Sequence, residues 1–331
     1  MTWERSRVVD VALEATVVGS FSKLGYVVRS RLENWTPLSS YDLTGKTVVV
    51  TGPTSGLGKE VATTLRHINA NLVLVGRNRE KLDALQSELM EQSGDGALST
   101  FVADMGDLTA VSNVSRAIAV EFPAIDALIH NAGALLSNRV ITSDGIEETI
   151  ASHVVGPYVM TSLLLDALRS AHGRVITVSS GGMYTAALPH LGQGGSLEMR
   201  EDKYDGVKQY ATAKRAQVTL NEIWAQKESA VQFYCMHPGW SDTPGVQQAL
   251  PKFRNVAKLI LRDVAQGADT ICWLTAEKTV PGDSGTFWCD RSTRSIHRLP
   301  TTKRADTATA RDALWLWCQQ FVLGPRTTSN S

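Results

Sequence analysis

The sequence lacks the patterns that mark a metal site or a disulfide framework. Its 331 residues include four scattered cysteines, Cys235, Cys272, Cys289 and Cys318, with no CxxC pair and no histidine at metal-ligand spacing. We therefore expect reduced cysteines that pack in the interior of a cytoplasmic protein, and no metal site.

Net charge is also absent. Lys and Arg together number 33, and so do Asp and Glu. No field of one sign is available to attract the phosphates of nucleic acid. We expect no nucleic-acid partner.

Long hydrophobic runs are missing as well. The most apolar N-terminal stretch, residues 8–28, is interrupted by Asp10, Glu14 and Lys23. A membrane-spanning helix needs about 18 uninterrupted apolar residues, and a signal peptide needs a basic start and a small-residue cleavage site. We therefore expect no transmembrane segment and no signal peptide.

Residues 1–43 form a helical leader ahead of the first strand. Its apolar side chains recur every three to four residues, as on one face of a helix: Val9, Leu13, Val17, Phe21, Leu24 and Val28. We interpret it as a helix docked on its own domain or on a twin subunit, which favours a homo-oligomer. Peripheral contact with a membrane surface is the alternative, weakened by the acids on the polar face.

From Lys46 onward, apolar strand patterns alternate with helix-length segments. The expected strands are residues 47–51, 72–75, 100–103, 127–130, 175–178 and 231–236. Such alternation predicts an α/β fold with a Rossmann-type, doubly wound parallel sheet. We expect a single oxidoreductase domain over residues 44–300, followed by a C-terminal helix and tail over residues 301–331.

The C-terminal helix is predicted over residues 306–323. Asp306 or Thr307 would cap it, and Gly324 and Pro325 would end it. Its apolar stripe indicates a core or subunit contact rather than a cofactor site: Leu314, Trp317, Cys318 and Phe321.

A glycine-rich turn follows the first expected strand and opens a helix. Gly52, Gly56 and Gly58 would let the backbone turn tightly and approach a pyrophosphate, which the helix N-terminus would bind. A purely structural turn is the alternative. The cofactor-binding residues expected here are Gly52, Thr54, Ser55, Gly56, Leu57 and Gly58.

The residue after the second strand decides the cofactor type. An acid there would bind the ribose 2′-hydroxyl, whereas a cation would bind a 2′-phosphate. The sequence has Arg77 and no acid. It therefore favours NADP(H) over NAD(H), with a solvated helix-start arginine as the alternative.

Tyr210 and Lys214 carry the strongest catalytic signal. Residues four apart share one helix face, so the ammonium would lie near the phenol and favour its ionised form. Ser180 follows the strand at residues 175–178, at the strand end where such sheets bind ligands. Its hydroxyl could hold a substrate oxygen.

With these motifs and the Asn131, Ala132, Gly133 triplet in this order, residues 44–290 resemble the short-chain dehydrogenase/reductase superfamily, in particular its retinol-dehydrogenase-like branch. The resemblance implies an oxidoreductase with Ser180, Tyr210 and Lys214 as catalytic residues. It also implies a cofactor role for the loops after the later strands, with these residues: Asp104 and Met105 at the adenine, Asn131, Ala132 and Gly133 in the cleft, and Pro238, Gly239 and Thr243 at the carboxamide.

His153 departs from the pattern of this superfamily, which has an asparagine there. Pro157 lacks an N–H group, so the carbonyl of His153 would lose its helical partner. We predict a kink at residues 153–157, with this carbonyl free to reach a water near Lys214. A packing role and a loss of activity are the alternatives for His153.

The function predicted is therefore hydride transfer between NADP(H) and a carbonyl or alcohol substrate. The segment 240–263 matches the substrate loop of the family and is apolar enough for a lipophilic substrate: Val246, Leu250, Phe253, Val256, Leu259 and Ile260. An NADP(H)-binding regulatory or scaffold protein is the alternative, and a nucleotide-sugar epimerase is disfavoured by the glycine spacing.

Overall fold

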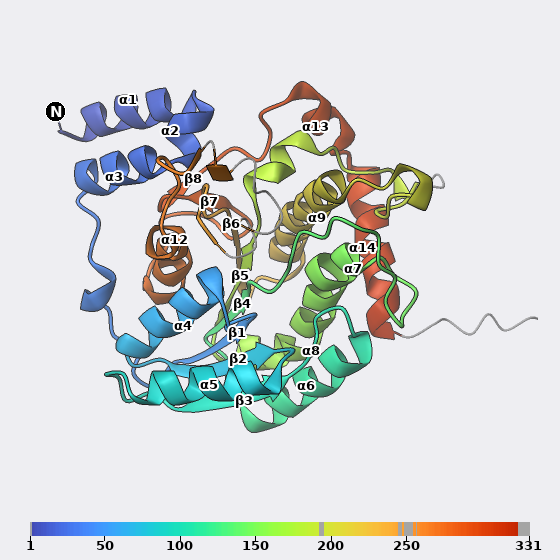
Figure 1. Cartoon of the computed structure of the whole chain (residues 1–331), viewed down its shortest axis with the longest axis horizontal. Helices are drawn as coiled ribbons and strands as arrows, with labels where there is room; N and C mark the ends of the chain where they lie inside the picture. Colours follow the sequence, from blue (N-terminus) through green and yellow to red (C-terminus); the bar gives the residue numbers. More distant parts are fainter. Residues whose placement is uncertain (1, 192–194, 244–246, 248–253, 256, 324–331) are drawn as a thin grey trace, which may run out of the picture.

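An eight-stranded sheet runs through the computed structural model (Figure 1). The structure describes residues 2–191, 195–243, 247, 254–255 and 257–323. In these residues the strands lie in the order β3-β2-β1-β4-β5-β6-β7-β8. Their bounds are β1 Thr47–Thr51, β2 Asn71–Gly76, β3 Leu98–Val102, β4 Ala127–His130, β5 Arg174–Val178, β6 Gln232–Met236, β7 Phe287–Cys289 and β8 Ser292–Thr293.

Strands β1 to β7 are parallel, and only β8 runs antiparallel to its described neighbour. The central strands are short runs of branched apolar residues, such as Val48, Val49 and Val50, which are buried on both faces. Such runs suit a parallel sheet covered on both sides. The strand order reverses between β1 and β4, which creates the crevice where open α/β sheets bind their ligands.

Helices cover both faces of the sheet, and each face has its own core. Leu65, Leu82 and Ile271 belong to one core cluster, and Leu164 and Leu314 belong to the other. The first cluster involves α4 Gly56–His67, α5 Arg79–Met90 and α12 Val264–Ala276; the second involves α6 Leu108–Glu121, α8 Gly156–Ser170, α9 Gly206–Lys227 and α14 Ala308–Leu323. The predicted doubly wound fold is confirmed.

The segment expected as one kinked helix is continuous, but its helical type changes along its length. A short helix α7, Glu148–Ile150, leads through a π-helical turn, Ala151–Val155, into α8. By length and composition alone the combined segment Glu148–Ser170 could cross a membrane, but 78% of its apolar window is buried inside the fold. It therefore acts as the core helix between α6 and α9.

The leader is three helices rather than one. These are α1 Thr2–Glu14, α2 Val17–Phe21 and α3 Lys23–Leu32. The Thr16 hydroxyl accepts a hydrogen bond from the Gly19 N–H and caps the start of α2. The chain therefore turns at a point where the apolar stripe predicted a continuous helix. The prediction of one continuous apolar face was wrong, because Val17 and Leu24 are exposed while Phe21 is buried.

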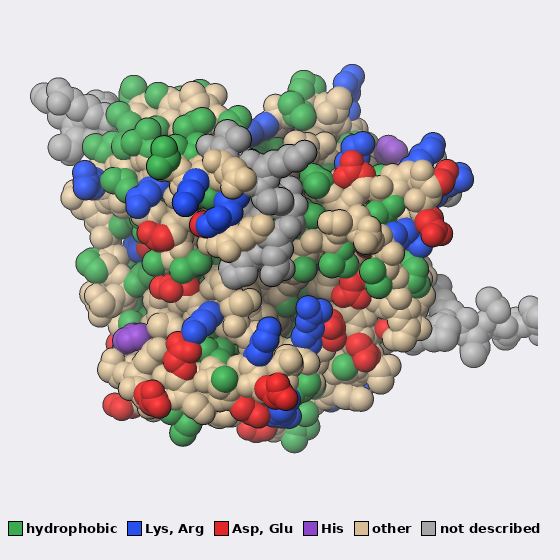
Figure 2. Space-filling model, in the orientation of Figure 1, with side chains coloured by type: hydrophobic (Ala, Val, Ile, Leu, Met, Phe, Trp, Pro, Cys, Tyr) green, Lys and Arg blue, Asp and Glu red, His purple; other side chains and the backbone are tan. Residues whose placement is uncertain are grey.

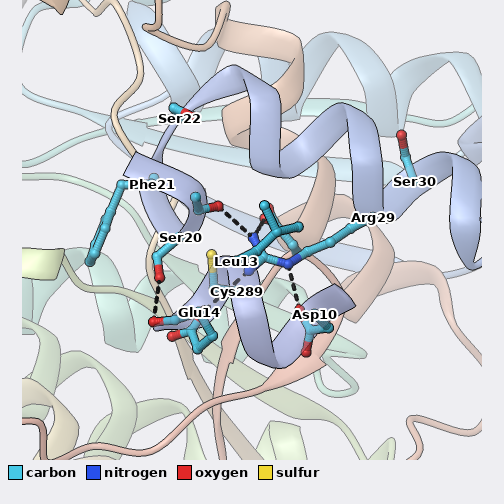
Figure 3. Close-up of polar contacts among 12 residues, drawn as sticks. Asp10, Leu13, Glu14, Ser20, Phe21, Ser22, Arg29, Ser30 and Cys289 are labelled. Atoms are coloured by element: carbon cyan, nitrogen blue, oxygen red, sulfur yellow. Dashed lines mark hydrogen bonds and ion pairs between the residues drawn. The ribbon is translucent and has the colours of Figure 1, made fainter. Parts of the chain in front are cut away.

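A buried ion-pair cluster attaches the leader to the domain. Arg29 of α3 donates to Asp10 (2.6 Å) and to Asp290 beyond β7 (2.7 Å). Arg262 donates to the same Asp290 carboxylate at 2.5 and 2.9 Å. Figure 3 shows Arg29 extending between the leader helices toward Asp10. The leader thus docks on its own domain.

The C-terminal part matches the prediction in outline. Helix α14 begins at Ala308, and the Thr307 hydroxyl accepts a hydrogen bond from the Ala310 N–H, so Thr307 is the cap. Asp306 instead pairs with Arg311. A short helix α13, Pro300–Ala305, precedes it. The four cysteines are free and buried, as expected, whereas Gly324 and Pro325 lie outside the described residues.

We expect Asp290→Asn to lower the free energy of unfolding by about 3–5 kcal/mol, because two buried guanidinium groups lose their shared counter-ion. Urea unfolding followed by circular dichroism measures the change. Asp202→Asn is the matched control, since its pair with Arg200 is exposed and should be worth at most about 1 kcal/mol. Equal effects of the two substitutions would contradict the role given to Asp290.

Candidate active site

The glycine-rich turn after β1 is held by the loop after β4. The Asn131 side chain donates to the carbonyls of Thr51 (3.1 Å) and Gly52 (3.0 Å). The Thr51 hydroxyl accepts from the backbone N–H groups of Asn131 and Ala132. Gly52 has φ +66, and a β-carbon there would come within 2.8 Å of the Ala132 Cα. The turn therefore requires glycine at 52, and Asn131 shapes it as expected.

The N-terminus of α4 is suited to an anion. Gly56, the first helical residue, has φ +53. Ser55 stands at the cap position in an extended conformation and makes no side-chain cap hydrogen bond. The first N–H groups of the helix are therefore left to bind a phosphate. Thr54 is half-buried beside this turn, while the Leu57 side chain packs on the core.

Arg77 stands at the end of β2 with its side chain 73% exposed. Its nearest acid is Asp104, at 3.5 Å, which accepts a hydrogen bond from the Gly106 N–H. An exposed ion pair of this length contributes little free energy, so the guanidinium can leave Asp104 and bind another anion. Met105 is buried below Asp104.

Ser180, Tyr210 and Lys214 meet at the C-terminal end of β5. Ser180 starts the turn after the strand, where its hydroxyl accepts a hydrogen bond from the Gly182 N–H, and it lies close enough to the Tyr210 phenol to lower the pKa of that phenol. Tyr210 and Lys214 share a face of α9, with the Lys214 ammonium 5.2 Å from the centre of the phenol ring. Lys214 also donates to the carbonyl of Val178 at 2.8 Å. The structure thus brings together the three residues that the sequence singled out.

Burial changes the acidity of both titratable groups. It raises the pKa of Tyr210 to about 12, against a smaller lowering effect of the Ser180 hydrogen bond. It lowers the pKa of Lys214 to about 7. Without a bound ligand, Tyr210 is a neutral proton donor and Lys214 titrates near neutrality.

His153 lies against this group. Its ring is edge-on to Tyr210, with centroids 5.3 Å apart, and Nε2 lies 3.0 Å from the carbonyl of Ala134. Burial and the Lys214 charge hold its pKa well below the usual value, so the ring is neutral. Since a carbonyl only accepts, Nε2 carries the proton, and Nδ1 is buried with no partner among the described residues. A β-carbon on Gly133 would collide with this ring.

The His153 carbonyl, which we predicted to be free, has a partner, and the relay from it to Lys214 stays a prediction. A π-helical turn stands at the predicted kink, and the Gln217 side chain donates to this carbonyl at 2.8 Å. Gln217 supplies a donor where the missing N–H of Pro157 leaves none. Lys214 donates one of its three possible hydrogen bonds to the Val178 carbonyl. The sequence offered a signal for Gln217, which lies one helical turn after Lys214.

The loop after β6 completes the site. Gly239 has φ +70, and it follows Pro238 directly. The Thr243 N–H donates to the carbonyl of Ser241 at 2.9 Å, which folds this loop back on itself. Of the expected substrate-loop residues, Val246, Leu250, Phe253 and Val256 lie outside the described residues, while the Leu259 side chain is 95% exposed.

Comparison with known proteins gives a consistent result. A family model described as short chain dehydrogenase matches residues 46–189. Dehydrogenase/reductase SDR family member 12 of Homo sapiens is 35% identical over 280 residues, which cover 84% of this chain and 86% of that protein. Retinol dehydrogenase 11 of Homo sapiens is 30% identical over 216 residues, covering 64% and 66%.

Solved structures share the fold. A short chain dehydrogenase from Escherichia coli CFT073, complexed with NADPH, aligns with a TM-score of 0.60 and 23% identity. The alignment covers 76% of this chain and 98% of that one.

We expect Lys214→Met to stabilise the fold most below about pH 7 relative to wild type, with the difference shrinking toward about pH 9. The pKa of Lys214 is about 7 in the folded chain, below its ordinary value of 10.5. Between these two values the unfolded chain binds this proton and the folded chain does not, so the free energy of unfolding of the wild type rises with pH. Urea midpoints across this range measure it. Lys208→Met, at an exposed position of α9, is the control. A difference that does not vary with pH would contradict the depressed pKa.

Proposed function

The chain belongs to the short-chain dehydrogenase/reductase family, and from this premise we propose that it is an NADP(H)-dependent oxidoreductase for a lipophilic carbonyl or alcohol. Members of the family bind NAD(P) and act on CH–OH and C=O groups. The observation that carries the proposal is the convergence of Ser180, Tyr210 and Lys214 beside the glycine-rich turn. Figure 2 shows a hollow near the centre of the face it presents, with Lys and Arg side chains beside it.

The residues at the turn after β1 fit a dinucleotide. The uncapped start of α4 would bind the pyrophosphate, and the loops carrying Asn131 and Gly239 would flank the rest of the cofactor. When bound, the nicotinamide supplies or accepts the hydride. The protein contributes binding, orientation and the proton.

Tyr210 is the proposed acid and base. As a neutral phenol it can give its proton to a carbonyl oxygen that receives a hydride, and it takes the proton back when an alcohol is oxidised. Ser180, which lies next to the phenol, would hold the same oxygen. The Lys214 ammonium, 5.2 Å from the ring centre, would favour the phenolate when charged.

The preference for NADP(H) rests on Arg77. The guanidinium is exposed at the end of β2, and its weak pair with Asp104 leaves it able to bind a 2′-phosphate. A lipophilic substrate is supported by the exposed Leu259 side chain in the segment that resembles the substrate loop of the family. A cytoplasmic location and a homo-oligomeric state stay predictions.

His153 favours a second candidate function. Its neutral ring fills the position next to Tyr210 where the family has an asparagine, which supports an NADP(H)-binding protein with weak or no catalysis. Incubation of the pure protein with NADPH and a panel of aldehydes and ketones separates the two. Loss of absorbance at the nicotinamide band supports the oxidoreductase, and binding without turnover supports the alternative.

We expect Tyr210→Phe to lower turnover by at least about 100-fold while NADPH binding stays nearly unchanged, because only the proton donor is removed. Initial rates and a fluorescence titration of NADPH measure both. Tyr41→Phe is the control, since its hydroxyl bonds Glu277 away from the site. Wild-type turnover in Tyr210→Phe would refute the role.

We expect NADPH to bind at least about 1.5 kcal/mol more tightly than NADH, roughly a ten-fold ratio, and Arg77→Ala to remove most of this difference. Titration calorimetry with both cofactors measures it. Arg79→Ala, two residues further along and also exposed, should leave the ratio unchanged. Equal affinities in the wild type would exclude the proposed contact.

A further inference from the structure

One leader side chain reaches the catalytic end of the sheet. Phe21, at the end of α2, is 5% exposed and belongs to a third core cluster with Met183 and Tyr184 from the turn after β5. Its ring stacks on His237 (centroids 4.7 Å apart) and on Trp240 (5.7 Å). The leader therefore contributes to packing around both loops of the site.

The Phe21 ring lies directly against the turn that carries Ser180. A β-carbon built on Gly181, the next residue, would collide with the ring, so no space separates them. The Tyr184 ring closes the other side, edge-on to Phe21 at 6.3 Å. The ring thus supports the turn whose first residue, Ser180, lies next to Tyr210.

The backbone of Phe21 holds the second loop. Its carbonyl accepts hydrogen bonds from the Trp240 N–H (2.8 Å) and from Arg262 Nε (3.1 Å). A β-carbon on Gly239 would come within 2.7 Å of the same carbonyl. The loop with Pro238 and Gly239 is therefore packed against the leader.

Hydrogen bonds and ion pairs also hold the backbone next to Phe21 in place. Arg262 also donates to the carbonyl of Ser20 and to Asp290, which pairs with Arg29 of α3. In Figure 3 the Phe21 ring points away from Arg29. The Arg298 guanidinium, which pairs with Glu14 of α1, lies 5.2 Å from the centre of the Phe21 ring, so charged groups of the same region also contact the ring.

We propose that Phe21 is a positioning residue, which fixes the Ser180 turn and the Gly239 loop relative to Tyr210. This rests on the proposed function. Phe21 touches none of the residues of the glycine-rich turn in the described contacts, so it would affect orientation at the reacting end more than binding of the pyrophosphate.

Truncation of the ring should loosen the turn without unfolding the domain. In Phe21→Ala the atoms next to Gly181 are lost, and the Ser180 hydroxyl is held less firmly. A misplaced group of this kind costs on the order of ten- to a hundred-fold in kcat. Phe21→Leu keeps apolar atoms against Gly181 and should restore much of that loss. The Kd for NADPH should change by less than about three-fold in both, because the phosphate contacts are distant.

The experiment measures amide hydrogen exchange, kcat, KM and NADPH affinity on the full chain. Peptides covering residues 179–186 and 237–242 should exchange about ten-fold faster in Phe21→Ala, while residues 47–60 should not change. Val18→Ala, an exposed position on the same short helix, is the control and should match wild type throughout.

The outcomes separate this inference from the proposed function. If the wild type reduces no carbonyl in the panel, the proposed function fails, and exchange at residues 179–186 and 237–242 alone decides whether Phe21 orders the two loops. Unchanged exchange there, or unchanged kcat in an active and folded Phe21→Ala protein, would overturn the proposal. If Phe21→Ala does not fold, the same measurements are made on Phe21→Leu, whose side chain is intermediate in size, and the same outcomes decide the proposal.

Discussion

Parallel pairing of β1 to β7 brings the carboxyl ends of all these strands to one edge of the sheet. Side chains that are far apart in the sequence therefore meet at this edge because of the strand order. The turn after β1 lies beside the loop after β4, and the turn after β5 lies between the loops after β4 and β6, because β1, β4, β5 and β6 follow one another in the sheet. Tyr210 and Lys214 join them because α9 packs against the turn after β5 and against β6, and burial there sets their pKa values of about 12 and about 7.

Features with a local cause could be predicted from the sequence. The apolar runs predicted β1, Thr47–Thr51, and β4, Ala127–His130, at their observed bounds, and the other predicted strands within a few residues. The four-residue spacing was enough to place Tyr210 and Lys214 on one face. The strands β7 and β8 were missed because they are three and two residues long, with positive φ at Asp290 and Arg291 between them.

Features with a distant cause could not be predicted. Arg29 is 261 residues from Asp290, and nothing near it in the sequence indicates that it will be buried. The stripe of the leader suggested an apolar face, yet polar contacts and one aromatic ring attach it. The His153 carbonyl was expected to be free because only its own helix was considered, whereas Gln217 reaches it from another helix.

The buried contact between Arg29 and Asp290 has a consequence for the order of folding. The leader precedes the first strand in the chain, but its partners Arg262 and Asp290 come after β6 and β7. Such non-local closure is slow, since the entropy of a long loop is lost before the contact forms. We therefore expect residues 2–32 to dock only after β6 and β7 have joined the sheet, as the last step of folding.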